Sequence, residues 1–218
     1  MRSFTMNKQK IKAVFYDLDN TLYPQVLDVQ QRVRFCIKEF SLPKCVEEFW
    51  ITEWLDNGPK KTNIIDNVID TFSLKIDKYL LLSAYRSYKT SLSLDKDVRN
   101  MLIDIKRRGI KQFLITNGQP IVQLGKINSL GLSEFFDNIS IAVGSHAKPC
   151  PHLFLETIRN YGLESEQCLS VGDWYEIDGV ASIDAGIYFL HIEGGPIKEN
   201  LPSGVRSIIK LPYIEDFL

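Results

Sequence analysis

The sequence predicts an α/β fold: a parallel β-sheet flanked by helices, with a small all-α unit inserted after the first strand. Short apolar runs alternate with amphipathic helical patterns over most of the chain, which is typical of strands joined by crossover helices. One long stretch breaks this alternation and shows helical spacing only. The 218 residues, 44% of them hydrophobic, provide enough apolar surface for one substantial core and a small inserted module.

Five short apolar runs are the expected strands, and amphipathic helices are expected between them. The runs cover residues 11–17, 109–116, 139–144, 167–173 and 186–192. Apolar stripes at helical spacing run through Val98, Met101, Leu102 and Ile105, and through Phe154, Ile158 and Tyr161. Gly109 and Gly186 stand where two helices should end, and Pro120 stands where another should begin.

Residues 23–95 are expected to form the helical insertion, which leaves residues 1–22 and 96–218 for the unit that contains the sheet. Apolar residues recur there at helical spacing, first at Val26, Val29, Val33, Ile37 and Phe40. No strand pattern interrupts them. Trp50 and Trp54 lie four residues apart, and we interpret them as packing core of the insertion rather than as a ligand platform.

Composition argues against several classes of protein. The 26 basic and 27 acidic residues give a net charge of −1, so no nucleic acid polymer or anionic membrane is expected as a partner. The first ten residues lack the apolar stretch of a signal peptide, and no apolar run approaches the roughly 20 residues that cross a bilayer. The four cysteines are scattered, as in reduced proteins: Cys36, Cys45, Cys150 and Cys168. We therefore expect a cytoplasmic protein.

Polar residues follow the expected strands at the points where the strands end. They are Asp17 and Asp19 after the first strand, Thr116 and Asn117 after the second, Lys148 in the loop after the third, and Asp173 and Asp178 after the fourth. In an open parallel sheet, ligands bind at the edge where the carboxyl ends of the strands meet. We therefore expect these side chains to line one shared crevice.

The chemistry of these side chains indicates a site for a divalent cation and a phosphoryl group. Neighbouring carboxylates repel one another, and a hard cation such as Mg2+ removes this repulsion while accepting oxygen ligands. Lys148 is explained if a phosphate lies between the metal and its ammonium group, with the Thr116 hydroxyl and nearby backbone N–H groups as further donors. Each motif alone has a simpler structural explanation, such as a turn or a surface loop, but the four in this order indicate a site.

The four motifs closely resemble those of the haloacid dehalogenase (HAD) superfamily of phosphotransferases. Asp17-Leu18-Asp19-Asn20-Thr21 matches the first motif, D-x-D-x-T, and the residues LITN, which end at Asn117, are similar to the second. AKPCPHLF, from Ala147, resembles the third motif with its lysine, and VGDWYEIDGVASIDAG, from Val171, resembles the fourth, G-D-x-x-x-x-D. The resemblance covers the chain outside the insertion. It implies a Rossmann-like core in which the insertion is an α-helical cap of the C1 type.

The resemblance also implies a role for each site residue. Asp17 would be the nucleophile that forms an aspartyl-phosphate, and Asp19 would be the general acid and base. Thr116, Asn117 and Lys148 would bind the phosphoryl group, and Lys148 would also orient Asp17. Mg2+ would be held by Asp17, by the backbone carbonyl of Asp19, by Asp173, and by Asp178 directly or through water.

The expected activity is Mg2+-dependent hydrolysis of a small phosphorylated metabolite, either a nucleoside monophosphate or a sugar phosphate. The aspartate at position 19 argues against a dehalogenase, whose leaving halide needs no proton. Two alternatives stay open: a phosphomutase of the β-phosphoglucomutase type, and a catalytically silent binding protein with the HAD fold. The residues DNTLYP, from Asp19, resemble the pyrimidine-5'-nucleotidase-like branch. Candidates for contacting a second anionic group, or else solvated surface charges, are Lys60, Lys61, Arg86 and Lys89.

Overall fold

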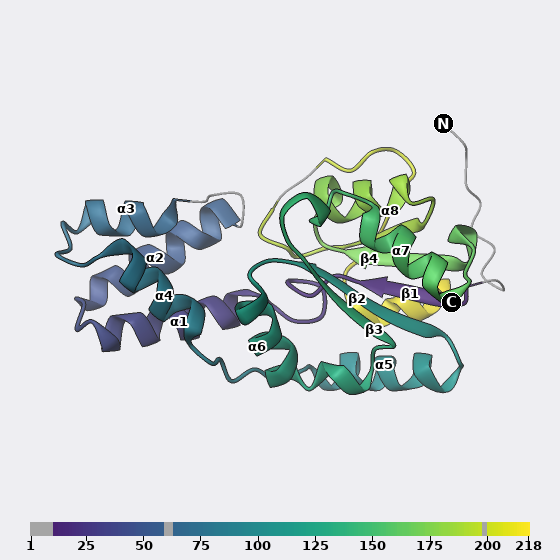
Figure 1. Ribbon diagram of the computed structural model, residues 1–218, viewed down its shortest axis with the longest axis horizontal. Helices are drawn as coiled ribbons and strands as arrows, with labels where there is room; N and C mark the ends of the chain where they lie inside the picture. Colours follow the sequence, from purple (N-terminus) through teal and green to yellow (C-terminus); the bar gives the residue numbers. More distant parts are fainter. Residues whose placement is uncertain (1–10, 59–62, 198–199) are drawn as a thin grey trace.

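The computed structural model describes residues 11–58, 63–197 and 200–218. Residues 1–10, expected to contain no signal peptide, and the candidate anion contacts Lys60 and Lys61 lie outside the described residues. Figure 1 shows a sheet with helices on both faces and, beside it, a separate group of helices. None of the helices in the described part of the chain has the length and apolar character that crossing a bilayer requires.

The sheet of the described chain has six parallel strands in the order β3-β2-β1-β4-β5-β6. The strands are β1 (Ala13–Tyr16), β2 (Lys111–Asn117), β3 (Asn138–Ala142), β4 (Cys168–Gly172), β5 (Tyr188–Ile192) and β6 (Arg206–Ile208). All five predicted strands are present, and the predicted fold class is confirmed. β6 was not predicted, because it has only three residues at the sheet edge and two of them are exposed, so no apolar run marks it.

Helices cover both faces of the sheet (Figure 1). Successive side chains of β1 point to opposite faces, so Val14 and Tyr16 pack on one side while Ala13 and Phe15 pack on the other. The first side is completed by α5 (Lys96–Arg107) and α6 (Pro120–Leu130), and the second by α7 (His152–Tyr161) and α8 (Val180–Asp184). Because both faces are covered, the strand ends are the part of the sheet that can meet a ligand.

The predicted ends of the core helices are confirmed. Gly109 follows α5 with a φ of 75°, a left-handed conformation that glycine adopts without strain because it lacks a Cβ. Gly186 follows α8 with a φ of 76°. Pro120 is the first residue of α6, where its missing N–H costs no helical hydrogen bond.

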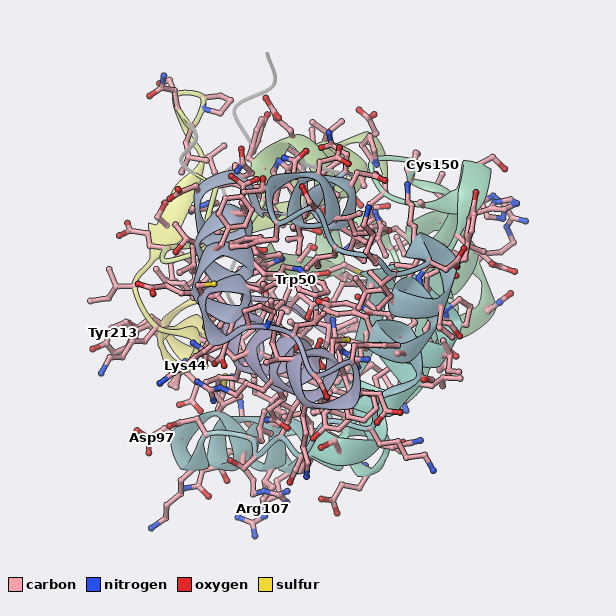
Figure 2. All side chains as sticks on the ribbon, turned by 90° about the vertical axis from the view of Figure 1, so that its left-hand side faces the viewer. Lys44, Trp50, Asp97, Arg107, Cys150 and Tyr213 are labelled. Carbon is pink, nitrogen blue, oxygen red and sulfur yellow. The ribbon has the colours of Figure 1, made fainter. Side chains whose placement is uncertain are left out.

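The inserted helices form a unit with a core of its own. They are α1 (Val26–Glu39), α2 (Lys44–Asn57), α3 (Ile64–Thr71) and α4 (Lys78–Ser87). Trp50 and Trp54 are 2% and 8% exposed and pack in one cluster with Val33, Val68 and Leu81. Figure 2 views the molecule from this end and shows Trp50 near the centre, among these helices. The helical character of the insertion is confirmed, while its exact boundaries stay a prediction.

A buried ion pair, which the sequence analysis did not predict, connects α1 to α4. Arg32 Nε lies 2.8 Å from Asp28 Oδ2 one turn away on α1, and the two side chains are only 1% and 3% exposed. Arg32 Nη1 also donates to the carbonyl oxygens of Tyr85, Arg86 and Tyr88, at 2.9, 3.2 and 3.0 Å. These carbonyls lie at the carboxyl end of α4, where the helix dipole favours a cation. Arg32 therefore fixes the first and last helices of the insertion to each other.

Replacing Arg32 with methionine should destabilise the protein by about 3–5 kcal/mol, because the buried Asp28 carboxylate would lose its hydrogen-bonded cation and keep only the more distant Lys126. Equilibrium unfolding in urea measures this loss. Arg34 offers a matched control on the same helix, since it pairs with Glu47 at 2.8 Å but its side chain is 60% exposed. Arg34→Met should cost about 1 kcal/mol or less. Equal losses in the two variants would contradict the role assigned to the buried pair.

Candidate active site

The register of the central strands brings the predicted site residues together. Tyr16, the last residue of β1, pairs with Leu114 of β2 and with Val171 of β4. Asp17 follows directly, and its backbone N–H donates to the Val171 carbonyl at 3.0 Å. The carboxyl ends of β1, β2 and β4 therefore lie side by side, which is the arrangement that the sequence predicted.

Three carboxylates gather at this edge of the sheet. One oxygen each of Asp17, Asp173 and Asp178 lies within 4.8 Å of the other two. All three were predicted as metal ligands, and the structure places them together. An all-oxygen donor set of this kind fits a hard divalent cation such as Mg2+. Asp19 was expected to contribute its backbone carbonyl, and its side chain lies outside this group.

Lys148 is the cation that offsets part of the charge of the three carboxylates. Its Nζ donates to Oδ1 of Asp17 and to Oδ1 of Asp178, each at 2.6 Å, and to the carbonyl oxygen of Ile115 at 2.8 Å. The side chain is 3% exposed, so water hardly screens these contacts. The contact with Asp17 was predicted, whereas the bond to Asp178 was not. With Asp173 nearby, three acids share one buried cation, which favours the binding of a second cation.

Burial changes the pKa of several of these groups. It raises the pKa of Asp17 to about 7, although the charge of Lys148 opposes the shift. Burial, together with the charges of Asp17 and Asp178, raises the pKa of Asp173 to about 8. Burial alone would lower the pKa of Lys148, but the two carboxylates that it contacts outweigh this effect and hold its pKa above its usual range. Near neutral pH these shifts favour bound protons on Asp17 and Asp173, and a cation that the three carboxylates could hold would take the place of these protons.

The loop after β4 holds Asp178 in place. It forms a π-helical turn over Tyr175–Gly179, and the backbone N–H of Trp174 donates to Oδ2 of Asp178 at 3.2 Å. Gly172 packs against the same carboxylate so closely that a Cβ at this position would lie 2.6 Å from its carbon atom. A larger residue would displace Asp178, which explains why glycine precedes Asp173 in the fourth motif.

The end of β2 supplies Thr116 and Asn117. Thr116 Oγ1 accepts a hydrogen bond of 2.6 Å from the Gln123 side chain, which leaves its hydroxyl hydrogen for a phosphoryl oxygen. Asn117 Nδ2 donates to the Lys148 carbonyl at 2.8 Å, and its Oδ1 accepts from the Lys148 N–H at 2.9 Å. Both residues line the same pocket as Asp17. Asn117 therefore fixes the loop that carries Lys148, in addition to its predicted role as a phosphate ligand.

The Asp19 side chain points to α6 instead of joining the carboxylate cluster. It accepts two bonds of 2.8 Å from Lys126, one of 3.1 Å from Gln123 and one of 2.7 Å from Tyr23. Asn20 makes the sharp turn after it, with a φ of 58° that asparagine tolerates better than most residues. Burial by itself would raise the pKa of Asp19, but the Lys126 charge and the bonds from these three donors hold its pKa below the usual range.

Tyr23, Gln123 and Lys126 were not predicted as site residues. The buried positions of α6 are Gln123, Lys126, Ile127 and Leu130, which follow helical spacing. Two polar residues thus occupy the stripe that packs against the core, and this is the signal that could have identified them. Tyr23 carries no comparable signal, because a buried tyrosine is unremarkable in a core.

A larger cleft between the insertion and the core adjoins this site. The pocket around Asp17 and Lys148 has a volume of about 140 Å³, which suits a group of phosphate size. The adjoining cleft has a volume of about 520 Å³ and shares Asp19 with the pocket. Trp50 and Trp54 line the cleft from the side of the insertion. The two tryptophans, interpreted from the sequence as packing residues, therefore pack in the helical core and also line the cleft.

Comparison with protein families decides where the chain belongs. The family of haloacid dehalogenase-like hydrolases matches residues 11–186, a range that contains every predicted site residue. The chain belongs to the haloacid dehalogenase-like hydrolase family. The superfamily resemblance inferred from the four motifs is thereby confirmed.

Individual relatives share much of the length of this HAD protein. Glyceraldehyde 3-phosphate phosphatase of Methanopyrus kandleri is 26% identical over 210 residues, which cover 88% of each chain. N-acylneuraminate-9-phosphatase of Rattus norvegicus is 25% identical over an alignment of 247 residues, covering 96% of this chain and 95% of the relative. The HAD hydrolase YfnB of Bacillus subtilis, solved bound to magnesium, superposes with a TM-score of 0.78 at 17% identity, over 95% and 98% of the two chains. This last likeness shows the shared fold.

Mg2+ should raise the thermal stability of the protein, and by more at alkaline pH than at acidic pH. Without metal, folded Asp17 and Asp173 keep their protons up to about pH 7 and about pH 8, whereas ordinary carboxyls lose them near 3.8. Between these values the folded state binds more protons than the unfolded state, so stability falls as the pH rises. Mg2+ takes the place of the protons that are lost at alkaline pH. At ~100 times its Kd it should add about 2.7 kcal/mol to the free energy of unfolding.

Thermal unfolding with Mg2+ or with EDTA, at about pH 5 and about pH 9, measures this effect. Asp173→Asn removes one predicted metal ligand and one carboxyl whose pKa is raised, so both the Mg2+ effect and the pH dependence should weaken. Asp137→Asn is the matched control, because Asp137 pairs with Lys111 at the amino end of β2 and should leave the Mg2+ effect intact. A melting temperature that Mg2+ leaves unchanged at both pH values would contradict the metal site.

Proposed function

We propose that this HAD protein is a Mg2+-dependent phosphatase that hydrolyses a small phosphorylated metabolite through an aspartyl-phosphate on Asp17. One observation carries the proposal: Asp17, Asp173, Asp178 and Lys148 meet at one small pocket, where a cation and a phosphoryl group can be held together. Relatives named as phosphatases support it, among them the two described above.

In this mechanism Asp17 and Asp19 divide the chemistry. A carboxylate oxygen of Asp17 bonds to phosphorus and the bond from phosphorus to the alcohol oxygen breaks. Asp19 first takes up a proton from water as the substrate displaces one of its donors, and it gives this proton to the departing oxygen. Water then attacks the phosphorus and gives a proton to Asp19. The bond between Asp17 and phosphorus breaks, which restores the carboxylate and releases inorganic phosphate.

The other site residues bind and orient the reacting groups. Lys148 and the hydroxyl of Thr116 stabilise the negative charge on the transferring phosphoryl oxygens, and Asn117 adds a donor and fixes Lys148. Mg2+ would be held by the side chains of Asp17, Asp173 and Asp178 and by the backbone carbonyl of Asp19. When bound, the ion neutralises the charge that carboxylates and phosphate would otherwise concentrate in one pocket.

The helical insertion, residues 23–95, would act as the cap that selects the substrate. A cleft of about 520 Å³ is in the size range of small-molecule sites, so it can hold the alcohol part of a nucleoside monophosphate or of a sugar phosphate. Arg86 lines this cleft and is the best-placed described candidate for contacting a second anionic group. Lys89 is exposed and is not among the residues that line the cleft.

We place the protein in the cytoplasm, with a small metabolite as its partner and no nucleic acid polymer or membrane. All four cysteines are free thiols, two of them buried, as in proteins of reducing compartments. The net charge of −1 supports a partner that is recognised locally, at the site, and not through a long-range field.

Release of phosphate from a panel of nucleoside monophosphates and sugar phosphates, with Mg2+ or with EDTA, tests the proposed function. We expect turnover that requires Mg2+ and that falls by several orders of magnitude in Asp17→Asn, because the nucleophile is lost. Asp104→Asn, on the exposed face of α5, is the matched control and should retain full activity. Turnover that survives in Asp17→Asn would exclude this residue as the nucleophile.

The same panel separates the two alternatives. A phosphomutase would convert one sugar phosphate into an isomer without releasing phosphate, which product analysis by NMR detects. A silent binding protein would bind a panel compound without converting it. Either result, obtained with folded protein and Mg2+, would contradict the phosphatase proposal.

A further inference from the structure

The carboxylate of Asp19 is fully occupied by donors from outside the four motifs. A carboxylate offers about four lone-pair sites. At Asp19 these accept one bond from Tyr23, one from Gln123 and two from Lys126, one to each oxygen at 2.8 Å. A leaving-group oxygen can reach Asp19 only in place of one of these bonds. The donor that still holds the carboxylate after this exchange then determines where the proton is delivered.

Lys126 is suited to be that donor, because it contacts both oxygens of Asp19. Gln123 Nε2 contacts only Oδ2 and also donates to Thr116, and Tyr23 contacts only Oδ1. When one oxygen of Asp19 turns to a substrate, Lys126 can keep its bond to the other. The Lys126 side chain is 3% exposed, so water does not compete for this bond.

Lys126 is also in contact with the insertion. Its Nζ lies 3.9 Å from Oδ2 of Asp28, and both side chains are 3% exposed. Arg32 already satisfies Asp28 through two bonds of 2.8 and 3.0 Å, so that pair does not need Lys126 for its charge balance. The shorter bonds of Lys126 go to Asp19. The shorter distances show that Lys126 binds mainly Asp19. Through the longer contact with Asp28, α1 also touches Lys126.

We propose that Lys126 is the positioning residue of Asp19: it keeps hold of one carboxylate oxygen while the other serves the leaving group, and Asp28 links this arrangement to the insertion. The inference rests on the proposed function, since it requires Asp19 to act as an acid. A positioning role for Lys126 differs from a purely structural role in its effect on substrates whose leaving groups need a proton. Loss of Lys126 should harm a reaction in proportion to its need for an acid and leave attack by Asp17 on an activated ester nearly intact.

Comparing the turnover of two aryl phosphates of similar shape shows how strongly the reaction depends on an acid. 4-Nitrophenolate leaves without a proton far more readily than phenolate does, so 4-nitrophenyl phosphate depends on Asp19 less than phenyl phosphate does. Turnover of both is measured with wild type, Lys126→Met and Asp19→Asn. Lys111→Met is the matched control, because Lys111 pairs with Asp137 at the opposite end of β2. The ratio of the two rates does not depend on the folded fraction of a variant.

In Lys126→Met we expect turnover of phenyl phosphate to fall by roughly 10²-fold and that of 4-nitrophenyl phosphate by less than about tenfold, in the same direction as in Asp19→Asn. Lys111→Met should leave the ratio unchanged. Lys126→Gln keeps a hydrogen-bond donor, so the ratio of the two turnover rates should return part of the way to the wild-type value. This variant replaces Lys126→Met if the methionine variant does not fold.

Two results would overturn the inference, and they are distinguishable. An equal fall for both esters in the Lys126 variants, with a selective fall in Asp19→Asn, would remove the positioning role and leave the phosphatase proposal intact. Failure of the wild-type protein to release phosphate from either ester with Mg2+ would count against the proposed function, and the inference would fall with it.

Discussion

The contact of Lys148 with Asp17 and Asp178 is the interaction on which the rest of the site depends. Three acids lie where strands end at one edge of the sheet, and burial there penalises their charged forms. A single buried ammonium group offsets part of that penalty. The position of Lys148 is fixed in turn by Asn117, which bonds both the N–H and the carbonyl of its backbone. Motifs that lie far apart in the sequence therefore form one unit in which a single cation faces three acids.

A second buried lysine separates the two aspartates of the first motif. Residues two apart on a strand would share one face, but the turn at Asn20 directs Asp19 to Lys126 while Asp17 stays with Lys148. Burial raises the pKa of Asp17, whereas the donors around Asp19 lower its pKa. The proposed roles need the opposite order, an ionised nucleophile and a protonated acid. Bound Mg2+ would therefore have to lower the pKa of Asp17, and a substrate oxygen would have to displace a donor of Asp19 before Asp19 holds a proton.

The sequence predicted the sheet, the insertion and the acids at the strand ends, because each depends on local periodicity or on a motif. It did not identify Lys126 or Gln123, although both interrupt the apolar stripe of α6, since periodicity shows that a position is buried without naming its partner. The partner of Lys126 lies 107 residues away in the chain. Asp28 and Arg32 stand four residues apart on α1, a spacing that allows an ion pair but does not show that the pair is buried. β6 was missed because three edge residues carry no pattern.

The claim that Asp17 carries the phosphoryl group is tested most directly by trapping the intermediate. Borohydride reduces an aspartyl-phosphate to homoserine, which peptide mass spectrometry locates in the chain. Wild-type protein quenched during turnover with Mg2+ and a panel substrate should show homoserine at position 17 and unmodified aspartate at position 19. Homoserine at another position, or an unmodified Asp17 in protein that was releasing phosphate when it was quenched, would contradict the mechanism.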